Sequence, residues 1–177
     1  VRAFIVKMGL SMNDVNLPAD ILYAENRKII DSSAHRYFAV FNPKPIILNG
    51  KKYPKTIYAP RHPEFPEKGL REIPLGKTIY INQRDWQKHR GKTVRLMNFC
   101  TIQLNMAANV VTWDRTESYP IIQWVSEPHM RVQIIMPDGS IHKAIAEPMI
   151  NEVASGEMVQ LVRIGFCGAS WDTEQLT

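Results

Sequence analysis

The spacing of apolar and polar positions changes at about residue 32 of this 177-residue chain. Before that point, Phe4 and Met8 recur one helical turn apart, and Leu22 and Ile29 fall on one side of a second helical pattern. Recurrence at every third or fourth position is typical of an amphipathic helix. The pattern therefore predicts two short helices that form a helical connector over residues 1–32.

From residue 33 onward the pattern has a period of two and is interrupted by many of the chain's 12 prolines. Alternation over a few residues is typical of a half-buried strand, and clustered turn residues separate short strands. The sequence therefore predicts a mainly β fold, either a sandwich or a barrel. The expected strands are residues 45–48, 52–53, 78–81, 93–97, 121–125, 131–136, 141–144 and 158–166.

Three segments between the expected strands predict particular connections, namely two hairpin turns and one long loop. Asn49-Gly50 predicts a hairpin between the strands on either side, because this dipeptide favours the tight turn that joins antiparallel strands. Residues 137–140 predict a second hairpin. Residues 60–74 are predicted as a long loop, and loops of this length are often functional. The basic residues of this loop are Arg61, His62, Lys68 and Arg71.

Composition and charge indicate a compact, basic protein. Hydrophobic residues make up 45% of the chain, which is enough for a core, and a formal net charge of +5 attracts polyanions. Cys100 and Cys167 form no Cys-x-x-Cys pair and the five histidines lack ligand spacing, so no metal site is predicted. No stretch is long and apolar enough for a membrane span. We therefore expect a reduced, cytoplasmic chain with neither a metal nor a membrane partner.

Two apolar runs contain an arginine where a strand is expected. Arg36 lies within residues 35–43, and Arg163 lies within residues 157–167. Because an uncompensated charge in a core is costly, both side chains are expected to face a polar ligand or a groove.

These runs resemble the two ends of the anticodon-binding region of the glutaminyl-tRNA synthetases and the archaeal and eukaryal type of glutamyl-tRNA synthetase. In that family the first strand reads Arg-x-x-x-Val-x-Asp/Asn-Pro and the last reads Val/Phe-Gln-x-x-Arg-x-Gly-Phe/Tyr. Both patterns occur here, and the family's shorter motifs follow in the same order between them. Those motifs stand here as His62-Pro63, Gly69-Leu70-Arg71, Val94-Arg95-Leu96 and Gln123-Trp124-Val125. The run from Asn26 to Asp31 and the Gln-Trp-Val form look more like the archaeal glutamyl enzyme.

The resemblance implies two small β-barrels after the helical connector. A proximal barrel would be built from residues 33–85 and 156–177, which come from both ends of the β region. A distal barrel, residues 86–155, would be inserted between these two parts.

The resemblance also implies which residues recognise RNA. Arg36 matches the arginine that contacts the middle anticodon base, a uracil, and Gln160 matches the glutamine that shares this contact. Arg163 matches an arginine near the middle and third bases, and Arg95 matches one that contacts the first base. A guanidinium offers paired donors and an amide offers one donor and one acceptor, which suits the imide edge of uracil. Further candidate RNA contacts are Gln87, Lys88, Arg90 and Lys52.

Structural alternatives stay open for several of these residues. Arg36 could instead form a salt bridge with Asp31 or Glu157. Gln160 and Arg163 are three positions apart, which puts them on opposite faces of a regular strand. For Trp124 a core position is favoured over base stacking, and for His62 capping of its loop is favoured over RNA contact.

The resemblance implies the carboxy-terminal part of a glutamate-tRNA ligase, which binds glutamate tRNA. The chain has neither the nucleotide-binding signatures of a class I synthetase nor a Walker loop, so we expect it to be inactive alone and to need no cofactor. The full enzyme would use ATP with Mg²⁺. Three alternatives stay open: the corresponding glutaminyl domain, a free-standing basic β-barrel RNA-binding protein, and, last, a small hydrolase. The sequence does not decide whether glutamine tRNA is also a partner, nor which residue reads the third base.

Overall fold

The computed structural model describes residues 5–6, 19–49, 53–112 and 118–171, and the chain divides into two units, residues 1–34 and 35–177. The first unit contains helix α2 (Ala19–Asp31), which confirms the second predicted helix. Lys28 and Glu25 form an ion pair of 2.9 Å on its surface, one turn apart. Only residues 5–6 of the first predicted helix are described, and they are helical.

The second unit is mainly β, as predicted. Its strands in the first half are β1 (His35–Tyr37), β2 (Ala39–Phe41), β3 (Pro43–Asn49), β4 (Thr56–Pro60), β5 (Leu70–Pro74), β6 (Thr78–Asn82) and β7 (Thr93–Leu96). The later strands are β8 (Thr101–Gln103), β9 (Ala107–Thr112), β10 (Ile121–Ile122), β11 (Trp124–Ser126), β12 (Met130–Ile135), β13 (Ile141–Ala146), β14 (Met158–Leu161) and β15 (Gly165–Gly168). Its helical segments are α3 (Gln83–His89), η1 (Pro66–Lys68) and η2 (Pro148–Glu152).

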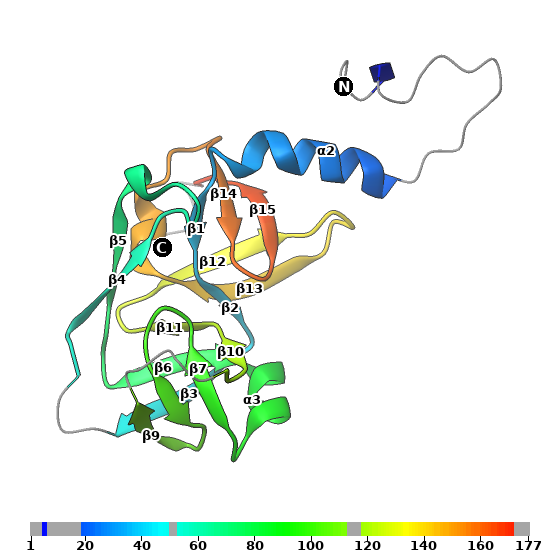
Figure 1. Cartoon of the computed structure of the whole chain (residues 1–177). Coiled ribbons are helices and arrows are strands. Elements are labelled where there is room, and N and C mark those ends of the chain that lie inside the picture. Colours follow the sequence, from blue (N-terminus) through cyan, green and yellow to red (C-terminus); the bar gives the residue numbers. More distant parts are fainter. Residues whose placement is uncertain (1–4, 7–18, 50–52, 113–117, 172–177) are drawn as a thin grey trace. The chain divides into compact units, whose positions relative to one another are not determined.

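The strands form one large sheet and three small ones (Figure 1). The large sheet has the order β10-β7-β8-β9-β3-β6-β11, and the small ones are β1-β14-β15, β12-β13-β2 and β4-β5. The first and last strands of the large sheet, β10 and β11, are separated in the chain only by Gln123, so this sheet curves until its two edges are neighbours. The hydrogen-bonded order nevertheless has two ends, and two closed barrels remain a prediction.

The sheets also do not follow the expected division of the chain into a proximal and a distal barrel at residues 85 and 155. Strands β3 and β6, from the part assigned to the proximal barrel, lie in the large sheet with β7 to β11. Strands β12 and β13, from the part assigned to the distal barrel, pair with β2.

Two apolar clusters fill the second unit. One combines residues of the large sheet with residues of β2, β4, β5 and β13, and it includes Trp124, which is fully buried and donates its indole N–H to the Met97 carbonyl at 2.9 Å. The favoured core position of Trp124 is therefore confirmed, and the ring cannot stack on a base. The other cluster includes Tyr37, Val159 and Leu161, and it lies under the sheet β1-β14-β15.

The hairpin predicted at Asn49-Gly50 would pair β3 with the segment that follows it, and β3 pairs elsewhere; residues 50–52 of the predicted turn and second strand lie outside the described residues. Strand β3 pairs with β6 and β9, and the next strand, β4, pairs with β5. The Asn-Gly dipeptide favours a turn, but β3 takes β6 and β9 as its partners, and both lie farther along the chain than the neighbouring segment. Pairing of this kind depends on tertiary context and not on a local turn signal. The second hairpin is confirmed, since β12 pairs with β13 and Asp138 caps the turn by accepting the Ser140 amide at 2.9 Å.

Three further expectations need correction. The loop predicted over residues 60–74 contains η1 and ends in β5, which carries Arg71. The single strand predicted over residues 158–166 is a hairpin, in which β14 pairs with β15. Helix α3 was not expected, because its seven residues lack an apolar period. Its start is nevertheless marked by Asn82, whose side chain accepts the Arg84 amide at 2.8 Å.

Candidate nucleic-acid interface

Arg36, Gln160 and Phe166 form one row across the sheet β1-β14-β15, which we call the recognition strip. Arg36 is the register partner of Gln160 in the parallel pair β1 and β14, and Gln160 is the partner of Phe166 in the antiparallel pair β14 and β15. Register partners project from the same face of a sheet. The expectation that Arg36 and Gln160 converge from the two ends of the β region is therefore confirmed.

The recognition strip lies on the outer face of its sheet. All three of its side chains are half-buried, whereas the next row contains Tyr37 and Leu161, which belong to the core. The alternation of the strands produces this division, since successive side chains point to opposite faces. A guanidinium, an amide and an aromatic ring are thus held together on rigid strands.

The strip is internally linked. The guanidinium carbon of Arg36 lies 5.9 Å from the centre of the Phe166 ring, within the range of a cation–π contact. The backbone fixes the strand as well, because the Arg36 amide donates to the Arg61 carbonyl at 2.7 Å.

Arg163 lies in the turn between β14 and β15, not in a strand. Its φ of 62° is in the left-handed region, and the Ile164 amide closes the turn by donating to the Leu161 carbonyl at 2.9 Å. The objection that Gln160 and Arg163 face opposite ways on one strand therefore does not arise. The turn aims Arg163 independently of the recognition strip.

Arg163 forms a paired ion contact with Asp85 of α3. Its two terminal nitrogens donate to the two carboxylate oxygens at 2.6 and 3.0 Å. The Asp85 side chain is 9% exposed and that of Arg163 is 45% exposed. This end-on pairing leaves the edge with Nε and one terminal nitrogen available for an acceptor, because a guanidinium carries five donors. Sequence reasoning missed Asp85, since no local pattern links positions so far apart.

Helix α3 and its carboxy-terminal end carry the other cationic candidates. Gln87, Lys88 and Arg90 are exposed. Trp86 is buried between two cations: the Lys44 ammonium lies 5.7 Å and the Arg90 guanidinium carbon 5.9 Å from its indole ring. Positive charge therefore gathers around α3, which is the helix that Arg163 contacts.

The last two candidates are Arg95, which the structure describes, and Lys52, which it does not. Arg95 lies on β7 and is half-buried; its amide donates to the Pro120 carbonyl at 2.9 Å. It belongs to the large sheet, whereas the recognition strip belongs to the sheet β1-β14-β15. The contact between Arg163 and Asp85 joins elements of these two regions. Lys52 lies outside the residues that the structure describes.

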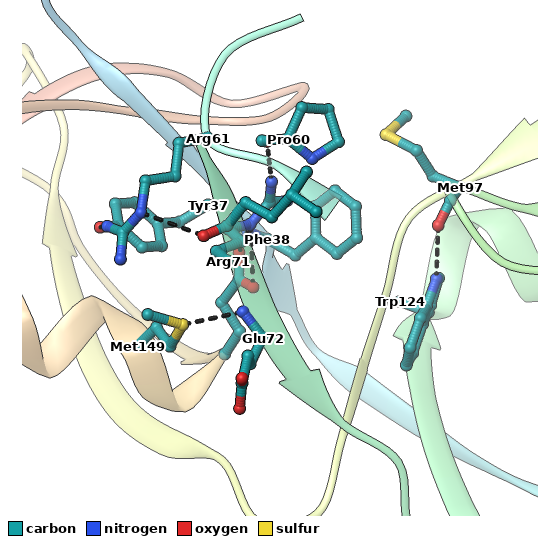
Figure 2. A network of polar contacts seen from close by, with 11 residues as sticks. Tyr37, Phe38, Pro60, Arg61, Arg71, Glu72, Met97, Trp124 and Met149 are labelled. Atoms are coloured by element: carbon teal, nitrogen blue, oxygen red, sulfur yellow. Dashed lines mark hydrogen bonds and ion pairs between the residues drawn. The ribbon is translucent and has the colours of Figure 1, made fainter. Parts of the chain in front are cut away.

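Arg71 is part of a buried network and cannot face RNA, contrary to the functional interpretation of its loop. Its Nε donates to the two carboxylate oxygens of Glu147 at 2.8 and 3.1 Å, and the side chains are 1% and 0% exposed. Figure 2 shows Arg71 donating also to the Pro60 carbonyl, and the Phe38 amide donates to Glu147 at 2.6 Å. Burial raises the pKa of Glu147, and the charge of Arg71 opposes that rise.

His62 caps its own loop, as favoured from the sequence. The side chain is fully buried, its Nδ1 accepts the Glu64 amide at 3.1 Å, and its ring lies 4.6 Å from that of Phe65, centre to centre. The His-Pro and Gly-x-Arg motifs therefore support the loop and β5 instead of contacting a ligand.

Within the described ranges, no three His, Cys, Asp or Glu side chains gather in a way that could hold a metal ion. In the same part of the chain, every helix is too short or too polar to cross a membrane. Cys100 and Cys167 are both free thiols, and burial raises the pKa of Cys100 to about 12.

Residues 34–116 and residues 121–169 match two family models, each described as the anticodon-binding domain of class I tRNA synthetases (E and Q). Glutamate-tRNA ligase of Methanosarcina mazei is 32% identical over 94% of this chain and 30% of its own length. The ligase of Hyperthermus butylicus is 33% identical over 94% of this chain and 32% of its own length. That of Archaeoglobus fulgidus is 29% identical over 99% of this chain and 32% of its own length.

The chain thus spans about a third of the length of the curated relatives it matches. The two family models together cover most of the chain, including all three residues of the recognition strip. The chain belongs to the family of anticodon-binding domains of the class I tRNA synthetases for glutamate and glutamine (E and Q).

Proposed function

We propose that this chain binds the anticodon of glutamate tRNA, as part of a cytoplasmic glutamate-tRNA ligase. The observation that carries the proposal is the recognition strip, in which Arg36 and Gln160 are register partners on the outer face of one sheet. Anticodon bases can be splayed out of their loop, and planar donors on rigid strands suit their edges. The named relatives are all glutamate-tRNA ligases, which favours glutamate over glutamine as the amino acid.

Arg36 and Gln160 are proposed to contact the middle base, a uracil. The Gln160 amide supplies one donor and one acceptor, which complement the imide edge, and Arg36 supplies donors for the remaining carbonyl. Arg163 would use its free edge beside the strip, while Asp85 holds the other end of its guanidinium.

The basic residues around α3 are proposed to contact the tRNA backbone. Lys88 and Arg90 are exposed there, and phosphate contacts fix orientation without selecting a base. Arg95 is proposed to contact the first anticodon base. Gln87, exposed on the same helix, is a further candidate contact.

Aminoacylation is proposed for the full-length enzyme and not for this chain alone. The full enzyme would attach glutamate to tRNA with ATP and Mg²⁺ as cofactors. None of the candidate residues described above is assigned to that chemistry, so this chain contributes recognition and orientation of the tRNA.

The proposal is tested by binding of glutamate tRNA to the full-length enzyme. Arg36→Ala or Gln160→Ala should weaken selection of the middle base by about 1–3 kcal/mol, a range known for bidentate base contacts in DNA. Matched controls are Arg131→Ala and Gln133→Ala, which change the same residue types on β12 of another sheet. The controls should leave the selection unchanged.

Base reading is refuted if Arg36→Ala and Gln160→Ala weaken binding of the natural tRNA and of a tRNA with a substituted middle base to the same extent. Anticodon binding as such is tested by salt. The logarithm of the affinity should fall with the logarithm of salt concentration, with a slope of about −0.7 per neutralised phosphate. An affinity that is independent of salt would refute an RNA ligand.

A further inference from the structure

Lys44 is a basic residue of β3 that neither the sequence pattern nor the family resemblance singled out. It lies at the end of the large sheet from which α3 leaves, because Lys44 and Ile81 are register partners and β6 ends one residue later at Asn82. The amide of Gln83, the first residue of α3, donates to the Asn42 carbonyl at 3.3 Å. The start of β3 and the start of α3 are therefore held side by side.

Trp86 of α3 brings Lys44 and Arg90 to one place. The Lys44 ammonium lies 5.7 Å and the Arg90 guanidinium carbon 5.9 Å from the centre of the indole ring, both within the range of a cation–π contact. Arg90 follows Trp86 by one helical turn, and its amide donates to the Trp86 carbonyl at 2.9 Å, so the helix sets their separation. The ring itself is only 8% exposed. Two cations from different elements are thus held against one fixed aromatic ring.

The protein does not neutralise these two cations. Within the described part of the chain, Lys44 and Arg90 form no ion pair, and Asp85, the residue before Trp86, is occupied by Arg163. Burial lowers the pKa of His89 on the same helix, and nearby cations lower it further, which indicates an excess of positive charge. Bringing like charges together costs free energy, and a bound anion offsets that cost.

We propose that Lys44 and Arg90, positioned by Trp86, bind one phosphate of the anticodon-loop backbone; this rests on the proposed function. An ammonium and a guanidinium both donate hydrogen bonds to phosphate oxygens, the guanidinium in pairs. Such a contact fixes the position of the strand and carries no information about the base. Trp86 is a positioning residue, since its indole touches the two cations and not the RNA.

The test measures binding of glutamate tRNA to the full-length enzyme at several salt concentrations. The double variant Lys44→Gln with Arg90→Gln should reduce the slope of log affinity against log salt by about 0.7, the contribution of one neutralised phosphate on a single strand. Over the decade between 1 M and 0.1 M salt this slope amounts to a factor of about 5, so the double variant should bind about 5-fold more weakly at 0.1 M salt. Each single variant should lose part of this affinity.

Lys77→Gln is the matched control. Lys77 is exposed and directly precedes β6, whose other end leads into α3, so the same charge is removed at the far end of one strand. The control should leave the slope unchanged. If the double variant has the same slope as Lys77→Gln, the phosphate site is overturned.

The phosphate is located with glutamate tRNAs in which one anticodon-loop phosphate at a time is replaced by an uncharged methylphosphonate. One of these replacements should weaken binding of the natural protein and have no effect on the double variant, because the contact is already absent. The proposal is wrong if every replacement weakens both proteins equally. It is also wrong if the loss in the double variant depends on the identity of the middle base.

The positioning role of Trp86 is tested by Trp86→Phe and Trp86→Leu. Phenylalanine keeps a ring and should retain the affinity, whereas leucine should weaken binding as much as the double variant and add nothing to it. An equal loss from leucine in both backgrounds would show that the ring only supports the fold. If the leucine variant unfolds, the phenylalanine variant still decides, since a folded variant that binds as weakly as the double variant refutes positioning by a ring.

Failure of this inference is distinct from failure of the proposed function. If Arg36→Ala removes selection of the middle base while the double variant binds like the natural protein, anticodon reading stands and only the phosphate site is refuted.

Discussion

The buried contact between Arg71 and Glu147 predicts that two mutations together do less harm than one. Glu147→Gln keeps the size of the side chain and an acceptor for the Phe38 amide, but it leaves the Arg71 charge buried without a counter-charge. Breaking a buried pair in this way typically costs about 3–5 kcal/mol, a large part of the stability of a domain. We expect Glu147→Gln to lower the free energy of unfolding by that amount.

Arg71→Met combined with Glu147→Gln should recover part of that loss. No charge remains buried, and the main remaining defect is the Pro60 carbonyl, which loses its donor at a cost of about 1–3 kcal/mol. The double variant should therefore be roughly 2 kcal/mol more stable than Glu147→Gln alone.

Urea unfolding followed by circular dichroism measures these differences. With a slope of about 2 kcal/mol per M, Glu147→Gln should move the midpoint down by roughly 2 M, and the double variant should regain about half of this shift. The slope itself should not change. If the double variant is less stable than Glu147→Gln, the buried charge is not what the pair compensates, and the reasoning is refuted.

The same pair predicts how pH affects Arg71→Met. In this variant burial raises the pKa of Glu147 above its ordinary value of 4.5 with no buried cation at Arg71 to oppose the rise, so the contribution of Glu147 to stability is full below 4.5 and is lost as pH rises through the folded pKa. Without Arg71 the pKa rises further, so stability should fall more steeply between acid and neutral pH than in the natural protein. An unchanged pH profile would contradict this.

Two further predictions concern contacts near the surface. Asp85→Ala and Arg163→Ala should not be additive, with a coupling of about 1 kcal/mol because Arg163 is partly exposed; additive losses of unfolding free energy would show that the pair contributes nothing. The Tyr80 hydroxyl donates to Glu127 at 2.5 Å, which raises the pKa of Tyr80 above 10.0. Its contribution to stability is therefore present below pH 10.0 and lost as pH rises through the folded pKa, and Glu127→Gln should lower the pH at which tyrosinate absorbance appears.

The recognition strip could be expected from the sequence because a charged side chain within an alternating apolar run is costly to bury in the core, so it is expected on the opposite face. Arg36 was expected to face away from the core for this reason, and Gln160 by resemblance, and the register of β1 and β14 brings them together. The role of both residues in RNA binding remains a prediction. Phe166 carried a signal too, since it follows Gly165 in the same motif, but a lone aromatic residue in a strand is usually buried.

The partners of buried charges could not be expected from the sequence. Arg71 was assigned to a functional loop because of the length of the segment 60–74; Glu147, the residue that neutralises it, follows β13 in the chain. Asp85 and Arg163 pose the same difficulty, since each is an ordinary charged residue in its own segment. Such contacts depend on tertiary packing, which local propensity does not encode.

The parallel pairing of β1 with β14 also constrains how the protein folds. Its two strands are more than a hundred positions apart, so closing that loop costs entropy before any contact across it can compensate, and contacts of this range slow folding. During synthesis β1 stays without its partner strand β14 until nearly all of the described chain has left the ribosome. The recognition strip is thus among the last features to form, so a nascent or truncated chain would expose a bare strand edge where the finished protein would hold its RNA.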